Sequence, residues 1–399
     1  MWSAIGKELQ GRADGTFRIL ARNEPGPKYA EVHEDSTARR TIRVSLSWCL
    51  KIFRGFQPYR RALIVFVGLV ICFVAFWHPF QADAEPDSTR EYLNKYNRPL
   101  SIPFPEDNRY SSERDLLGRT LFFDPRLSGS NWISCGTCHN PGLGWSDGLP
   151  KGIGHGMKEL GRRTPTILNL AWSEAFFWDG RAETLEEQAL GPITSPGEMN
   201  LPTNKLLDKL ISIPEYRALF HKAYREEPIN ENLIAKAIAT FERSVVSGMA
   251  PFDRWLDGDN AAVSAEAKRG FIIFNTKANC ANCHGGWRFT DDSFHDIGIP
   301  GEDRGRGELL KEIPSAQFAF KTPTLRNIDR RAPYMHDGSE TSLEAIIDFY
   351  NVGGKAKRPS LSAEINPLNL TAAEKRDLIA FLKTLTSTDK PVEIPVLPR

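Results

Sequence analysis

Hydrophobic and polar positions divide the chain into three stretches. The first, residues 1–61, is polar and mixed in charge. Its last part carries four basic residues, Lys51, Arg54, Arg60 and Arg61. An unbroken apolar run follows over residues 62–77. From residue 85 onward the apolar positions recur at the spacing of amphipathic helices, which predicts a helical folded part.

The apolar run predicts export of everything that follows it. It is longer than most signal-peptide cores and slightly shorter than the ~20 residues of a spanning helix. Basic residues before it keep the N-terminus in the cytoplasm, and Ala82-Asp83-Ala84 offers a cleavage site. We interpret 1–61 as a disordered n-region or cytoplasmic segment, and 62–84 as a signal or anchor. The folded part is then periplasmic, either free after cleavage or held to the inner membrane through 62–80.

Residues 85–399 are predicted to be mainly α-helical, because no run alternates as a half-buried strand does. Helices are expected from Ser112 up to the first cysteine motif, over 185–190, 204–211, 216–224 and 232–246, from Ser264 to Phe274, and from a Thr371/Glu374 capping box to Leu385. Glycines at seven positions between 142 and 161 indicate a loop. Turn residues near 251–260 predict a boundary between two haem domains, 85–255 and 256–399, each similar to cytochrome c.

The candidate chemistry lies in a C-x-x-C-H motif that occurs twice. Its copies are Cys135, Cys138 and His139, and Cys280, Cys283 and His284. This spacing is that of covalent c-type haem attachment. Two thiols three positions apart reach the two vinyl groups of one porphyrin edge, and the adjacent histidine faces the iron as proximal ligand. The sequence therefore predicts two covalently bound haem c groups.

A C-x-x-C pair is also typical of zinc ribbons and of redox dithiols. A zinc ribbon needs its two pairs about 15 to 20 residues apart, and these pairs are far more distant. A redox dithiol does not need a histidine directly after the second cysteine in both copies. The chain has six cysteines, and the remaining two, Cys49 and Cys72, precede the exported part. The haem interpretation is preferred, and the exported part has no cysteine left for a disulfide.

The composition argues against some kinds of partner but does not indicate a particular function. A hydrophobic fraction of 41% is ordinary for a globular protein, and a formal net charge of +1 gives no indication of a nucleic acid partner.

From about residue 85 to 385 the chain resembles the bacterial di-haem cytochrome c peroxidase superfamily, which includes MauG. The resemblance is carried by CGTCHN at 135–140, GHG at 154–156, RTPT at 163–166, FWDGR at 177–181, Gln188, GP at 191–192, EM at 198–199, KTPTLRN at 321–327 and APYMHDG at 332–338. This resemblance implies reduction of hydrogen peroxide at one haem, with electrons relayed through the other.

A peroxidase also needs an acid–base group above the open face of its iron, with a polar neighbour to position it. Glu198 is the candidate, and Gln188 matches the second pocket residue of the family. Pro192 matches a residue that shapes the pocket, and Trp178 matches a tryptophan between the two haems. From the residues alone, Glu198 could equally be a solvated charge after a turn, and Trp178 a core aromatic.

The resemblance assigns two further iron ligands. His155, on the glycine-rich loop, matches a histidine that ligates the peroxidatic iron at rest in many of these enzymes, and a solvent-facing loop histidine is the alternative. At the second haem the sixth ligand is usually a methionine, but here that position is Tyr350, as in MauG. Met335 as ligand, and Tyr350 as a core residue of an amphipathic helix, are the rivals.

The family also binds calcium between the haems through an asparagine, and Arg163 stands at that position. A guanidinium cannot ligate a cation. Either calcium is absent and Arg163 replaces its charge, or an altered site uses other oxygens, such as the carbonyls of Arg331 and Pro333.

Three functions follow from these observations. The main one is periplasmic peroxide reduction to water, with electrons from a small donor protein such as a c-type cytochrome or a cupredoxin. The alternative is peroxide-driven oxidative modification of a partner protein, as in MauG. A non-enzymatic di-haem electron-transfer cytochrome is the third, and the Gln188/Glu198 pair weighs against it. The sequence does not decide between a monomer and a homodimer.

Overall fold

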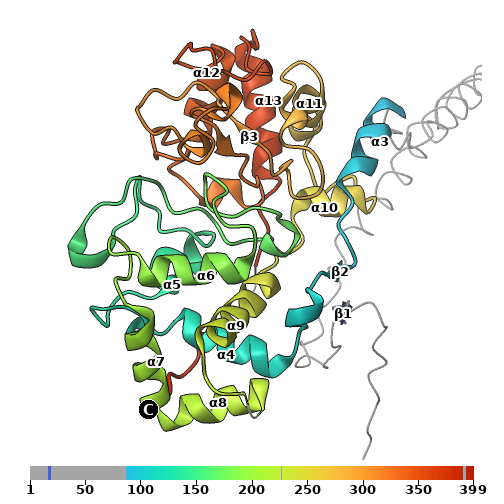
Figure 1. Cartoon of the computed structure of the whole chain (residues 1–399). Coiled ribbons are helices and arrows are strands. Elements are labelled where there is room, and N and C mark those ends of the chain that lie inside the picture. Colours follow the sequence, from blue (N-terminus) through green and yellow to red (C-terminus); the bar gives the residue numbers. More distant parts are fainter. Residues whose placement is uncertain (1–16, 19–86, 226, 390–391) are drawn as a thin grey trace, which may run out of the picture. The chain divides into compact units, whose positions relative to one another are not determined.

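The computed structural model describes residues 17–18, 87–225, 227–389 and 392–399. Helices dominate this part of the chain, as predicted, and the strands are two residues long each. The α-helices are α3 (Asp87–Leu93), α4 (Ser112–Phe122), α5 (Cys135–Cys138), α6 (Leu185–Thr194), α7 (Thr203–Ser212), α8 (Pro214–Tyr224), α9 (Glu231–Ser244), α10 (Pro251–Leu256), α11 (Ala265–Asn275), α12 (Leu343–Asn351) and α13 (Ala372–Lys383). Figure 1 shows α4 to α9 in one half and α11 to α13 in the other.

The first hydrophobic core lies among α4, α6, α7, α8 and α9. Helix α9 packs against both α4 and α6. The approach of α4 to α9 is so close that a Cβ at Gly118 would lie 1.9 Å from the carbonyl oxygen of Ala237, so only glycine fits there. The fully buried residues Leu117, Leu121 and Ile234 belong to this core. We call it the first core.

The second core is built around the contact between α11 and α13. Aromatic rings fill it, among them Phe271, Phe289 and Phe381, which are almost completely buried. Two residues from the start of the described region, Leu93 and Tyr96, also pack here, and so does α10. Both cores lie within one compact unit, Ser88–Arg399.

Local sequence signals account for most helix ends. Ser111, Thr184, Asn230, Ser264 and Ser342 each accept a hydrogen bond from a backbone N–H of the first turn that follows them. The capping box of Thr371 and Glu374 starts α13, as predicted. The helices expected from the periodicity are all present, and most ends move by one to four residues. The helix from Ser112 is the exception, because it ends at Phe122 and a turn and loop lead from there to the first cysteine motif.

Loops and single turns fill the remainder. The strand pairs are β1 (Phe17–Arg18) with β2 (Ser101–Ile102), and β3 (Phe294–His295) with β4 (Phe320–Lys321), both antiparallel. The 3-10 turns are η1 (Asn94–Tyr96), η2 (Glu106–Asn108), η3 (Pro125–Leu127), η4 (Pro141–Leu143), η5 (His155–Met157), η6 (Leu170–Trp172), η7 (Cys280–Asn282), η8 (Arg306–Glu308), η9 (Pro314–Ala316) and η10 (Ile328–Arg330).

Some predictions concern residues that the structure does not describe. The n-region at 1–61 and the signal or anchor at 62–84 lie outside the described residues, apart from the two residues of β1. Within the described ranges, no helix has the length and apolar character to cross a bilayer. The division into domains 85–255 and 256–399 stays a prediction.

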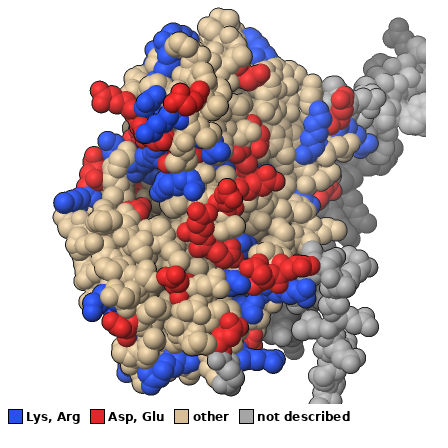
Figure 2. Space-filling model, in the orientation of Figure 1, with Lys and Arg blue, Asp and Glu red and all other residues tan. Residues whose placement is uncertain are grey.

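The surface carries both signs of charge. Figure 2 shows basic and acidic side chains mixed over the visible face, with acidic ones gathered across its middle. Helix α6, which lies at that height in Figure 1, bears Glu186 and Glu187 in its first turn.

Candidate haem and peroxide site

One large cavity, of about 640 Å³, contains both cysteine motifs. Its walls come from α5, α6, α9, α12 and the loops that follow each motif. Nearly all the site residues predicted from the sequence line it: Cys135, Cys138, His139, Trp178, Gln188, Pro192, Glu198, Cys280, Cys283, His284 and Tyr350. The fold therefore brings two motifs that are far apart in sequence to a shared internal space.

The first motif forms the short helix α5, which presents its two cysteines to the cavity. A Cβ at Gly136, between the cysteines, would lie 2.5 Å from the Phe123 ring, so a glycine lets this turn pack tightly on the first core. The ring of His139 donates from Nδ1 to the carbonyl oxygen of Trp145 at 3.2 Å. Burial lowers the pKa of His139, so the ring is neutral.

The second motif repeats this arrangement. His284 donates from Nδ1 to the carbonyl oxygen of Phe289 at 2.9 Å, and burial lowers its pKa as well. A carbonyl oxygen only accepts hydrogen bonds, so Nδ1 carries the ring hydrogen in both histidines and Nε2 keeps its lone pair. A metal-ligating histidine is oriented in this way, with its second nitrogen held by a backbone carbonyl.

The cysteines also fit haem attachment better than the alternatives. No disulfide joins the four cysteines of the motifs. Burial raises the pKa of Cys138 to about 11 and that of Cys280 to about 12. In both motifs the histidine after the second cysteine is oriented by a backbone carbonyl. Two such motifs on one shared cavity fit a pair of covalently attached haem groups.

Helix α6 and the turn after it form the wall above the first motif. Pro192 lies inside α6 and has no N–H to donate to the carbonyl oxygen of Gln188, four residues earlier. After the helix, the N–H of Glu198 donates to the carbonyl oxygen of Ser195 at 3.1 Å, which closes a tight turn. The side chains of Gln188 and Glu198 make no hydrogen bond with the described residues, and both face the cavity.

His155 occupies a different position from the other predicted ligands. Its backbone N–H donates to the carbonyl oxygen of Gly197 at 3.0 Å, so the glycine-rich loop rests on the turn that carries Glu198. The approach is close, since a Cβ at Gly154 would lie 2.0 Å from that same oxygen. The His155 side chain does not line the cavity, and its Nδ1 is buried with no hydrogen-bond partner. Ligation by His155 stays a prediction.

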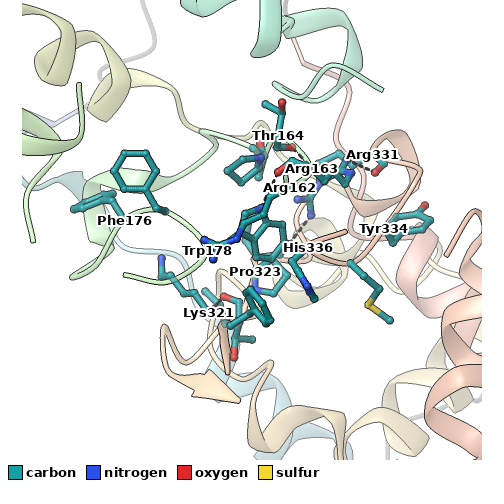
Figure 3. A pocket seen from close by; sticks show the side chains of 18 of the residues that line it. Arg162, Arg163, Thr164, Phe176, Trp178, Lys321, Pro323, Arg331, Tyr334 and His336 are labelled. Atoms are coloured by element: carbon teal, nitrogen blue, oxygen red, sulfur yellow. Dashed lines mark hydrogen bonds between the residues drawn. The ribbon is translucent and has the colours of Figure 1, made fainter. Parts of the chain in front are cut away.

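Trp178 is hydrogen-bonded to two segments, one that follows each motif in the sequence. Its indole N–H donates to the carbonyl oxygen of Arg163 at 2.8 Å, and its own carbonyl accepts from the N–H of Lys321 at 2.8 Å. The imidazole of His336 meets the indole edge-on, with 6.5 Å between ring centroids. Figure 3 shows Trp178 and His336 close together, with Arg162 and Arg163 beside them.

Tyr350 lies on the last turn of α12 and faces the second motif. It is not part of the second core, and its neighbour Phe349 is buried at 2% exposure. Burial raises the pKa of its phenol, and the thiols of Cys280 and Cys283 add to the effect, which places the ring near them. The hydroxyl makes no hydrogen bond with the described residues. The rival ligand, Met335, also lines the cavity.

Sequence reasoning missed several ionisable groups in the cavity wall, and Glu242 of α9 is the most buried carboxylate among them. This side chain is 4% exposed, and its Oε2 has no hydrogen-bond partner. Burial raises its pKa to about 8. The sequence did contain a feature that could have identified this residue. Glu242 falls four residues after Ile238, on the buried face of an amphipathic helix.

Comparisons with known proteins agree with this geometry. Residues 112–261 match the family described as di-haem cytochrome c peroxidase, and residues 267–386 match cytochrome c. The methylamine utilization protein MauG of Methylorubrum extorquens is 51% identical over 79% of this chain and 90% of its own length. MauG of Methylophilus methylotrophus is 47% identical over 76% and 91%. Cytochrome c551 peroxidase of Nitrosomonas europaea is 35% identical over 76% and 88%.

Solved structures give the same result. A crystal structure of a MauG-like protein associated with microbial copper homeostasis superimposes with a TM-score of 0.68 at 33% identity, covering 74% of this chain and 94% of that one. The diheme peroxidase BthA of Burkholderia thailandensis has a TM-score of 0.61 at 23% identity, covering 70% and 87%, and supports the fold alone.

Fold and site together define a c-type haem oxidoreductase with two haem-binding motifs in one chain. The chain belongs to the di-haem cytochrome c peroxidase family. It binds haem c and is an enzyme that acts on hydrogen peroxide.

Proposed function

We propose that the haem bound by the first motif reacts with hydrogen peroxide in the periplasm, and that the haem bound by the second motif is closed to it. The observation that carries this proposal is the difference between the two ends of the cavity. Glu198 raises the pKa of both cysteines of the first motif, and both cysteines of the second motif raise the pKa of Tyr350, so each lies near a different motif. Gln188 lines the same cavity from α6, and the side chains of Gln188 and Glu198 have no hydrogen bond within the described residues. His139 and His284 are the proximal ligands in this assignment.

The first motif has the residues that peroxide reduction requires. The reaction consumes one hydrogen peroxide, two electrons and two protons and yields two water molecules. Haem held by Cys135, Cys138 and His139 would supply a coordination position for peroxide and would pass the two electrons to it. Glu198 takes a proton from one peroxide oxygen and gives it to the leaving oxygen, as a general acid–base. Gln188 positions peroxide through its amide, and Pro192 holds the α6 wall that carries Gln188.

At the second motif we assign Tyr350 as the sixth ligand. Its hydroxyl has no hydrogen bond within the described residues, and a metal ion would compensate for the burial that raises its pKa. A phenolate is a hard, anionic ligand and favours ferric iron, whereas a methionine thioether is soft and favours ferrous iron. Tyr350 therefore suits a haem that holds oxidising equivalents shared with the first, with Trp178 between them.

The source of the two electrons separates two candidate functions. In the first, a c-type cytochrome or a cupredoxin donates them, and the enzyme removes peroxide. In the second, they come from side chains of a partner protein, which is thereby oxidatively modified. Tyr350 favours the second, and so do the identities of 51% and 47% to two MauG proteins. We therefore propose MauG-like modification of a protein partner as the physiological form of the peroxidase reaction.

Steady-state kinetics tests this choice. We expect slow peroxide turnover with reduced c-type cytochrome or cupredoxin, about 100-fold or more below that of a methionine-ligated relative assayed alongside. Peroxide added to the enzyme with cell extract fractions should give a covalently oxidised protein detectable by mass spectrometry. Rapid turnover with the small donors would instead identify a peroxide-removing enzyme.

We also propose that Arg163 takes the place of a calcium ion. Its Nη2 donates to the carbonyl oxygen of Arg331 at 2.5 Å and to Ser146 Oγ at 3.0 Å. This carbonyl is one of the two that the resemblance assigns to calcium, and the guanidinium occupies it. Metal analysis should find no calcium, and EDTA should leave the haem spectrum unchanged. Stoichiometric calcium in the purified protein would contradict the proposal.

A further inference from the structure

A second, smaller cavity adjoins the first on the outer side of α6. It has a volume of about 310 Å³ and is lined by Phe177, Arg181, Ala182, Glu187, Gly191, Ser195 and Glu198. Four of these residues, Phe177, Arg181, Ser195 and Glu198, also line the large cavity. These four side chains therefore form the wall between the two spaces. We call the smaller cavity the vestibule.

The Phe177 ring is held in this wall by its backbone and by its neighbours. Phe177 has φ of +66°, a left-handed conformation that a bulky residue rarely adopts. On one side, a Cβ placed on Gly191 of α6 would lie 3.2 Å from Cζ of the ring, so the ring rests directly against the helix. Strained backbone at a bulky side chain indicates a functional constraint at this point of the chain.

Arg181 covers the other side of the ring. Its guanidinium carbon lies 3.5 Å from the ring centroid, a cation–π contact. Asp179 holds the same guanidinium through both carboxylate oxygens, each at 3.0 Å. The Arg181 side chain is 42% exposed, so the vestibule wall reaches the surface at this residue. Phe177 is thus clamped between a helix and a fixed cation.

Glu198 lines both cavities, so the vestibule leads to the residue that we assign as the acid–base group. A small molecule that enters through the vestibule meets Glu198 when it passes the Phe177 ring. Glu187, on the rim, is exposed and accepts a hydrogen bond from the N–H of Glu183 at 2.9 Å. The approach to Glu198 is lined by Glu187 and Arg181 and by the clamped Phe177 ring, a setting that suits hydrogen peroxide and water better than a bulky organic hydroperoxide.

We propose that the Phe177–Arg181 pair is a size filter between the vestibule and the reaction cavity, and that it determines specificity for hydrogen peroxide over alkyl and aryl hydroperoxides. This inference rests on the proposed function, since it takes the first motif as the peroxide-reactive one. Phe177 lines both the large cavity and the vestibule, which places its ring at the boundary between them.

The test compares small and large ligands in the haem-loaded, full-length protein. Stopped-flow absorbance gives association rates for cyanide and for imidazole with the ferric enzyme, before and after Phe177→Leu and Phe177→Ala. We expect the imidazole rate to rise about 10-fold or more in Phe177→Ala and less in Phe177→Leu, with the cyanide rate changing about 2-fold or less. The ratio of kcat/KM for cumene hydroperoxide to that for hydrogen peroxide should rise in parallel.

Arg181→Gln provides a second variant at an exposed position, where folding is not at risk. It removes the cation that covers the ring, and we expect an imidazole rate about 3-fold to 10-fold higher. Arg376→Gln, at an exposed position on α13, is the matched control and should change nothing.

The outcomes separate the two proposals. Unchanged imidazole rates and an unchanged hydroperoxide ratio in all the variants would overturn the size filter and leave the proposed function standing. A wild-type protein whose haem spectrum responds neither to cyanide nor to peroxide would overturn the proposed function itself.

Discussion

The two ends of the cavity begin from the same local design and differ in what lies opposite each motif. At both, a histidine follows the second cysteine and donates from Nδ1 to a backbone carbonyl five or six residues later. Opposite the first motif stand Gln188 and Glu198, on a helix interrupted by proline and on a turn. Opposite the second stands Tyr350, on an uninterrupted helix.

This difference shows how a duplicated cofactor site acquires two roles. The residues that attach the haem at each site lie within one five-residue motif. A repeat of that motif is therefore enough to specify them. The opposite half comes from distant segments and can diverge without disturbing attachment. An open wall with an acid–base group favours reaction with a small oxidant, and a single phenol favours closure.

Removal of the attachment cysteines at one end should have the largest effect. Cys280→Ser with Cys283→Ser should lower the covalent haem content from two groups to one per chain, measured as the pyridine haemochrome. Cys135→Ser with Cys138→Ser is the matched variant and should also leave one group. The protein without Cys280 and Cys283 should retain a cyanide-responsive haem at the first motif. The protein without Cys135 and Cys138 should not respond to cyanide. Equal cyanide responses in the two would contradict the assignment of roles.

Glu198→Gln should abolish most catalysis while leaving both haem groups in place. The amide cannot shuttle the proton between the peroxide oxygens, so kcat/KM for hydrogen peroxide should fall about 10²-fold to 10⁴-fold. Glu174→Gln, at an exposed position, is the control. Activity within a factor of about two of the wild type would exclude Glu198 as the acid–base group.

Tyr350→Phe should alter the second haem alone. Loss of the phenol opens that iron, so the low-temperature EPR signal of the closed haem should disappear and a second cyanide should bind per chain. Tyr92→Phe, a tyrosine that packs on the second core and does not line the cavity, is the control. An unchanged EPR spectrum would mean that another residue, with Met335 the nearest rival, closes this site.

Glu242→Gln should have the smallest effect, and one that depends on pH. Because the folded-state pKa is raised to about 8 from 4.5, the folded protein binds this proton more tightly than the unfolded chain does. Wild-type stability should therefore fall as pH rises from 4.5 to 8, by as much as about 4 kcal/mol. The variant should lose this dependence, measured by denaturant unfolding at pH 5 and pH 8. Glu231→Gln, at the exposed start of the same helix, should retain it.

The sequence predicted the helices well and pointed to the two cysteine motifs that line the cavity, for a physical reason. Periodicity, capping residues such as Ser264 and Thr371, and the C-x-x-C-H spacing are local signals. The cavity is not local. That Tyr350 faces the second motif and that Gln188 and Glu198 face the first follow from tertiary packing, which the sequence indicated only through a family resemblance.

Other features had no clear local signal. Helical periodicity marks Glu242 as inward-facing, but only the structure places it in the cavity wall. The position of His155 outside the cavity, with its backbone on the Glu198 turn, depends on how closely two loops approach at Gly154. The position of Phe177 in the wall between the two cavities depends on its positive φ, which no sequence pattern predicts.

An equilibrium cyanide titration of the oxidised protein, combined with a pyridine haemochrome count on the same sample, tests the central asymmetry most directly. The account predicts two covalent haem groups and one bound cyanide per chain. Two bound cyanides, or fewer than two covalent haem groups, would contradict it.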